Sequence, residues 1–100
     1  MNPELNAMIA RILDAQRIED GYYVTPVPGL VLMRSVQELN PQHMQYRPKL
    51  CIVAQGAKEV MVADRTVRYG DGQSLVVTVE VPVLSQIVKA SSDKPFLGAV

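Results

Sequence analysis

Short apolar segments separated by turn signals constrain this chain more than any other feature. Between Tyr22 and Val100 they recur at intervals of roughly ten residues. Leu50–Ala54 is continuously apolar, which is typical of a strand covered on both faces. Leu75–Val81 alternates with a period of two, and Gly70-Asp71-Gly72 before it is a strong turn signal. This spacing predicts an all-β sandwich or barrel.

The segments between these strands are harder to assign. Glu38–Pro48 is polar and bounded by proline, so we expect a loop that contains His43. Pro82 is expected to end the alternating strand or to place it at a sheet edge, because proline cannot donate to a strand ladder. Further strands are expected over Leu30–Val36, Val60–Val62, Thr66–Tyr69, Gln86–Ala90 and Phe96–Val100.

The first segment has the pattern of a helix. Asn2 is a suitable N-cap, Pro3 suits the first helical position, and Asp20-Gly21 is expected to stop the helix. One apolar stripe at helical spacing consists of Leu5, Met8, Ile9, Ile12 and Leu13. The charges opposite the stripe are mixed in sign, which favours packing on protein over binding to a membrane. We therefore divide the chain into a helix (residues 1–21) and a β domain (residues 22–100).

Composition limits the functions that this chain can perform alone. One hundred residues suffice for one small domain, and ten Lys and Arg balance ten Asp and Glu without forming a basic run. DNA binding normally needs a basic surface, so we do not expect the chain itself to bind DNA. The single cysteine, the lack of a signal-peptide pattern and the lack of a membrane-length apolar stretch predict a cytoplasmic protein. The apolar run that ends at Val100 indicates a truncated polypeptide.

Several segments resemble the N-terminal family of AraC-type transcription regulators, and the resemblance covers residues 25–98. They are Thr25–Leu30, Pro48–Lys58, Tyr69–Gln73, Leu75–Val77, Val81–Val83, Ala90-Ser91 and Lys94–Gly98. The resemblance implies a cupin-like double-stranded β-barrel or sandwich after one N-terminal α-helix. It also implies a domain that senses a small molecule or dimerises, and that controls a C-terminal pair of helix-turn-helix motifs absent from this chain. The family often has a glycine near Ala63 and Asp-Pro-Gly at positions 70–72, so the turns here differ.

The residues offer little for catalysis. A cupin metal centre needs several His and Glu ligands, whereas His43 is the single histidine, so we expect no metal and no cofactor. Cys51 lies within an apolar strand and is expected to be a buried hydrophobic residue rather than a nucleophile. No convincing Ser-His-Asp arrangement is present. We therefore expect a protein that is not an enzyme.

A ligand pocket inside the barrel is the remaining kind of site. The candidate polar anchors are Tyr46, Tyr69 and Gln86, with His43 at a possible mouth. Each also has a simpler interpretation: the tyrosines as core or rim packing, Gln86 as an outward strand residue, and His43 as a solvated residue.

These observations favour an effector-sensing and dimerisation domain whose partners are an unknown small molecule and a second copy of the chain. DNA would be bound only through the absent C-terminal domain, and no membrane is involved. One alternative is a metal-free cupin enzyme of the sugar-derivative isomerase type, with Glu59, Glu80 or His43 as base, although Glu80 is expected to face solvent. Another is a pure assembly module, because strand edges and the apolar helix stripe favour self-association.

Overall fold

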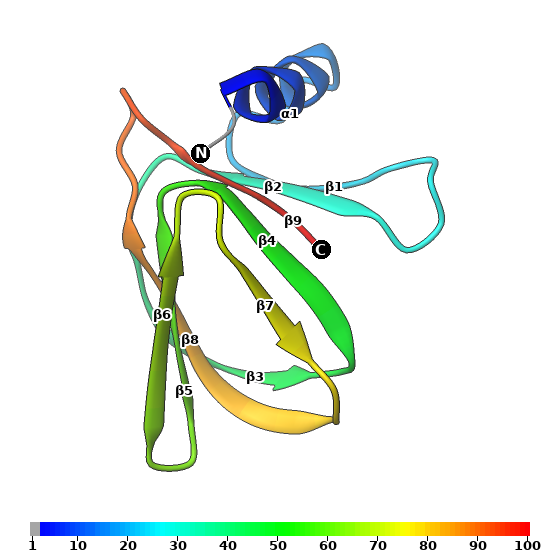
Figure 1. The fold of residues 1–100 in the computed structure, drawn as a ribbon. Helices are drawn as coiled ribbons and strands as arrows, with labels where there is room; N and C mark the ends of the chain where they lie inside the picture. Colours follow the sequence, from blue (N-terminus) through cyan, green and yellow to red (C-terminus); the bar gives the residue numbers. More distant parts are fainter. Residues whose placement is uncertain (1–2) are drawn as a thin grey trace.

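The computed structural model describes residues 3–100, which form one helix and nine strands (Figure 1). Asn2, the expected N-cap, lies outside the described residues. The elements are α1 (Pro3–Ala15), β1 (Gly21–Val24), β2 (Val31–Ser35), β3 (Leu39–Tyr46), β4 (Lys49–Gln55), β5 (Ala57–Val62), β6 (Arg65–Gly70), β7 (Ser74–Val77), β8 (Val81–Lys89) and β9 (Phe96–Ala99).

The strands form two antiparallel sheets that face each other. The larger sheet has the order β1-β2-β9-β4-β7 and the smaller has the order β3-β8-β5-β6. Figure 1 shows α1 lying over the outer face of the larger sheet. The prediction of a mainly β domain preceded by one N-terminal helix is therefore confirmed.

The main core lies between the sheets, because alternate side chains of each strand point inward. Its buried members come from β2, β3, β4, β5, β6, β8 and β9. They are Met33, Tyr46, Cys51, Val53, Val60, Tyr69, Val83, Ile87 and Phe96. The expected burial of Cys51 is confirmed, with 4% of its surface exposed.

A second cluster attaches α1 to the outside of the larger sheet. Ile9 and Leu13 of the helix pack with Leu32, Ala54 and Leu97 of the strands. The apolar stripe is thus only partly covered, since the other flank of the helix leaves Met8 52% and Ile12 38% exposed.

The helix ends earlier than Asp20-Gly21. Arg17 adopts a left-handed conformation with φ 60°, and the amide of Ile18 donates to the carbonyl oxygen of Leu13 at 2.9 Å. This is a Schellman-type end, which terminates a helix without glycine when the tertiary contacts hold it. Here Arg34 of β2 supplies those contacts, because its guanidinium pairs with Asp14 at 2.9 Å and donates to the carbonyl of Ile18.

The expectation of a loop over Glu38–Pro48 is wrong, because Leu39–Tyr46 forms β3. This strand lies at an edge and pairs only with β8, so its main-chain bonds hold it without an apolar alternation. The pairing shifts between Leu39 and Gln42, where Pro41 falls at the irregularity. His43 pairs with Leu84 and is exposed on this strand rather than in a loop.

The expectation of one strand over Leu75–Val81 is also wrong. β7 ends at Val77, residues 78–80 lie outside strands, and β8 begins at Val81 in the opposite sheet. Pro82 is therefore inside a strand. It pairs with Gln45 of β3 on one side only, because β5 pairs with β8 from Leu84 onward.

The turn between β5 and β6 generates a stability prediction. Ala63 has φ 54°, a left-handed conformation that costs an alanine about 1 kcal/mol and costs glycine little. We expect Ala63→Gly to raise the free energy of unfolding by about 0.5–1 kcal/mol, measured by urea denaturation. The control Ala57→Gly, in buried β5, should lower it instead. A lower free energy of unfolding for Ala63→Gly would show that the backbone at Ala63 is not strained.

Candidate ligand site between the two sheets

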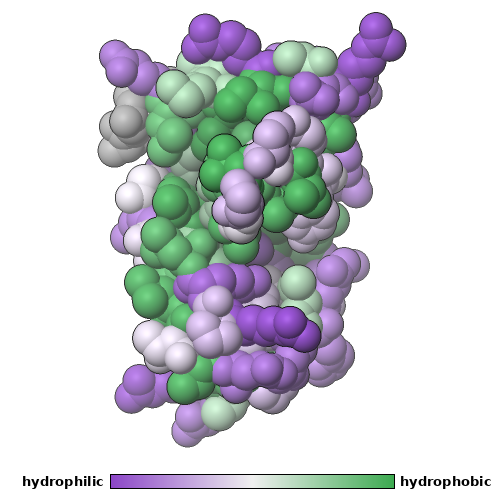
Figure 2. Space-filling model, turned by 90° about the vertical axis from the view of Figure 1, so that its right-hand side faces the viewer, coloured by the Kyte–Doolittle hydropathy of each residue, from purple (hydrophilic) through white to green (hydrophobic). Residues whose placement is uncertain are grey.

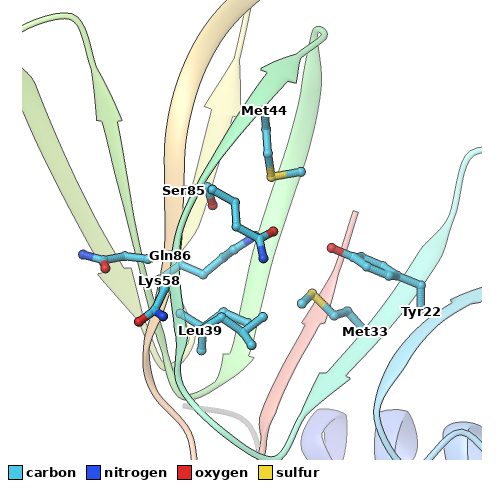
Figure 3. A pocket seen from close by; sticks show the side chains of 10 residues that line it. Tyr22, Met33, Leu39, Met44, Lys58, Ser85 and Gln86 are labelled. Carbon is cyan, nitrogen blue, oxygen red and sulfur yellow. The ribbon is translucent and has the colours of Figure 1, made fainter.

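The two sheets leave an opening between the β1–β2 side of the larger sheet and edge strand β3 of the smaller one. We call the space there the seam pocket. It measures about 260 Å³, part of it open to solvent. Figure 3 shows Tyr22 and Met33 from β1 and β2 facing Leu39 and Met44 of β3 across it.

A second space, the inner pocket, lies deeper in the sandwich and measures about 220 Å³, again including some solvent-open space. Its lining includes Cys51, Val53, Tyr69 and Phe96, together with Met33 and Lys58, which also line the seam pocket. Met33 and Lys58 therefore stand where the two pockets meet.

Lys58 points into the sandwich because it shares a strand face with core residues Val60 and Val62. Figure 3 shows its side chain extending from β5 into the space that faces Met33 and Tyr22. Burial lowers the pKa of Lys58 below its ordinary value. Within residues 3–100 no carboxylate forms an ion pair with this amine, whose nitrogen lies 5.9 Å from the ring centroid of Phe96.

Tyr69 reaches the inner pocket from β6 and is 4% exposed. Its hydroxyl is buried and forms no hydrogen bond of normal geometry among the described residues. Burial raises the pKa of the Tyr69 phenol, and the neighbouring Cys51 thiol and Tyr46 raise it further, Cys51 also through a weak side-chain hydrogen bond. The hydroxyl is therefore a neutral donor at physiological pH.

Tyr46 is also interior but is already satisfied. It is 1% exposed, and its hydroxyl donates to Oγ of Ser85 at 3.2 Å. The ammonium of Lys49 lies 3.9 Å from the centroid of its ring. Of the four predicted anchors, the structure brings Tyr46 and Tyr69 into the sandwich.

The other two predicted anchors do not face the interior. Gln86 borders the seam pocket, but its amide points away and donates to Glu59 at 3.2 Å (Figure 3). His43 is exposed on β3 and lines neither pocket. Sequence reasoning missed Lys58, although the alternation of Lys58, Val60 and Val62 places it on the inward face.

The candidate bases of the enzyme alternative also lie outside the sandwich. Glu59 accepts from Gln86, and exposed Glu80 accepts from Gln45 at 3.2 Å, so Glu80 faces solvent as expected. Across residues 3–100 no group of three or more His, Cys, Asp or Glu side chains could hold a metal ion. None of the described helices is long and apolar enough to cross a membrane.

Two facing antiparallel sheets around an interior pocket define a cupin-like fold, and a solved structure shares this fold along most of both chains. Protein NMB1881 from Neisseria meningitidis has a TM-score of 0.62 at 14% identity, over 91% of this chain and 90% of that one. A cupin-2 domain protein from Shewanella frigidimarina has a TM-score of 0.48 at 12% identity, over 70% of this chain and 65% of that one. Salicylate 1,2-dioxygenase from Pseudoaminobacter salicylatoxidans has a TM-score of 0.48 at 17% identity, over 99% of this chain and 32% of that one.

The family follows from the sequence match. The family of the AraC-type transcriptional regulator N-terminus matches residues 26–100, so the chain belongs to this family. The predicted resemblance over residues 25–98 is confirmed. No curated protein matches the chain.

The two interior tyrosines generate opposite predictions for the same chemical change. Tyr69→Phe removes a buried hydroxyl that forms no hydrogen bond of normal geometry and should raise the free energy of unfolding by about 1 kcal/mol. Tyr46→Phe removes a bond to buried Ser85 and should lower the free energy by about 1 kcal/mol. Urea denaturation of both variants and the wild type measures these changes. Equal losses of free energy of unfolding in the two variants would show that Tyr69 also has a strong hydrogen-bond partner.

Proposed function

We propose that this chain is the effector-sensing and dimerisation domain of an AraC-type transcription regulator. Family membership over residues 26–100 carries the proposal. The inner pocket supports it, because polar groups from different strands face a mostly apolar space. The domain acts in the cytoplasm, is not an enzyme, and binds a small molecule between its sheets.

DNA binding belongs to a helix-turn-helix domain outside these 100 residues. The ten Lys and Arg residues are balanced by ten Asp and Glu residues, and the most buried cation, Arg34, is paired with Asp14. A DNA-binding surface needs several unpaired cations on one face to displace the counterions of the phosphates. The charge balance favours a sensing role for this domain.

The test combines ligand and DNA binding on the same protein. A thermal-shift screen of cellular metabolites should yield compounds that raise the melting temperature saturably and stay chemically unchanged. Fluorescence anisotropy with duplex DNA at physiological salt should show no binding. Sequence-specific DNA binding by the chain, or turnover of a bound compound, would contradict the proposal.

Dimerisation is supported by apolar side chains on the outer face of the larger sheet. Leu50 and Val76 lie directly opposite each other on β4 and β7 and are 49% and 64% exposed. A groove of about 670 Å³, partly open to solvent, runs beside them and is lined by Leu30, Ile52 and Val100 among others. Figure 2 shows hydrophobic side chains gathered on this side of the molecule, at the level of the β1–β2 turn and the C-terminal end. Such patches commonly mark protein interfaces.

Sedimentation velocity over a concentration series tests this surface. The wild type should form a dimer, and the double variant Leu50→Ser, Val76→Ser should weaken dimerisation by about tenfold or more. The control Val67→Ser removes an apolar side chain that is 39% exposed on β6 of the other sheet and should leave the dimer unchanged. A wild-type monomer at high concentration would contradict dimerisation by this chain.

A further inference from the structure

The ammonium of Lys58 brings a positive charge into the space between the sheets. Lys58 is half-buried, lines both pockets and has no carboxylate partner within residues 3–100. Placing an ammonium among Met33, Val53 and Phe96 weakens its hydration, and burial lowers its pKa accordingly. A negative charge in the same space would offset this cost.

The hydroxyl of Tyr69 is a second polar group in the same space. The Tyr69 hydroxyl is buried and lines the inner pocket together with Lys58, and its neighbour among the described residues is the Cys51 thiol, a weak acceptor. The hydroxyl of Tyr46 already donates a hydrogen bond to Ser85, so it is not available to a ligand. Lys58 and Tyr69 thus come from two strands and offer two donors to one small space.

We propose that the inner pocket binds a small monocarboxylate. Its carboxylate pairs with the ammonium of Lys58 and accepts a hydrogen bond from the hydroxyl of Tyr69. Its short apolar body packs among Met33, Val53 and Phe96. This inference rests on the proposed sensing function, because it names the chemical class of the effector.

Charge and size favour a monocarboxylate over other ligands. One ammonium balances one negative charge, whereas a phosphate near its double charge would need further donors in a pocket whose other walls are mostly apolar. A sugar would need an acceptor or donor for each of its hydroxyls. The closed part of this pocket has room for about one water molecule, so a ligand must move Met33 aside and its body must be short.

The seam pocket supplies the route inward. Met33 lines both pockets, and Met44 and Tyr22 stand at the opening between β1 and β3 (Figure 3). Methionine is unbranched and flexible, so Met33 can change rotamer to admit a ligand without moving the strands. The ligand therefore reaches Lys58 first and Tyr69 deeper in the sandwich.

The experiment is a calorimetric titration at neutral pH with a panel of acids and their neutral amides. The panel contains the straight-chain acids from propionate to octanoate and benzoate, each beside its amide, and inorganic phosphate. At least one acid should bind saturably and about tenfold more tightly than its amide. If no acid binds, or if phosphate binds more tightly than every acid, the inference is overturned.

Variants locate the binding. Lys58→Met should abolish the preference for the acid over its amide, and Tyr69→Phe should weaken acid binding about fivefold. Lys94→Met makes the same change as Lys58→Met at an exposed loop residue and should bind as the wild type does. Because Lys58→Met removes a buried charge, it should fold, and thermal unfolding checks this. An unchanged acid preference in folded Lys58→Met would overturn the assignment.

The metabolite screen separates failure of this inference from failure of the proposed function. If neutral metabolites bind between the sheets and no acid does, the sensing function stands and the carboxylate assignment falls. If neither the metabolites nor the acids bind, both fall.

Discussion

The whole sandwich depends on the insertion of β9 between β2 and β4. This strand joins the last described residues to two segments far earlier in the chain. Its two faces contribute to both cores: Phe96 points inward between the sheets and Leu97 points outward under α1. Gly98 makes the close packing possible, because a Cβ there would lie 3.1 Å from the Phe96 ring and 3.2 Å from the carbonyl oxygen of Ile52. Without β9 the larger sheet would separate into two parts, and the interior pocket would lose one wall.

The same packing places polar groups in a space that folding alone would fill with apolar ones. Tyr46 and Ser85 satisfy each other and act as ordinary buried polar groups. Among the described residues Lys58 has no carboxylate beside it and Tyr69 has only the Cys51 thiol, a weak acceptor, so both reduce stability in the unliganded protein. Their position on rigid strands, rather than on loops, keeps them directed at one pocket. Two polar groups that lower the stability of the unliganded protein and point into the same pocket are what a recognition site requires.

Prediction from the sequence succeeded where burial leaves a periodic signal. The strand at Leu50–Ala54 and the helix stripe through Ile9 and Leu13 both appear as expected. It failed for β3, because an edge strand is held by main-chain bonds to β8 and needs no apolar alternation. It also failed at residues 78–80, where alternation continues in the sequence while the chain crosses from one sheet to the other.

The sequence by itself determined the mainly β class, the N-terminal helix and the family, since these depend on local periodicity and on motifs within short segments. Only the tertiary structure decided which polar side chains share the interior. Gln86 and Lys58 lie on neighbouring strands β8 and β5, yet the amide of Gln86 points outward whereas the amine of Lys58 points inward. The pairing of these strands shifts between Ala57 and Lys58. A shift of one residue in the pairing would reverse the face of every side chain on the strand. The register is therefore set by the contacts that bury one face, and these contacts join distant segments of the chain.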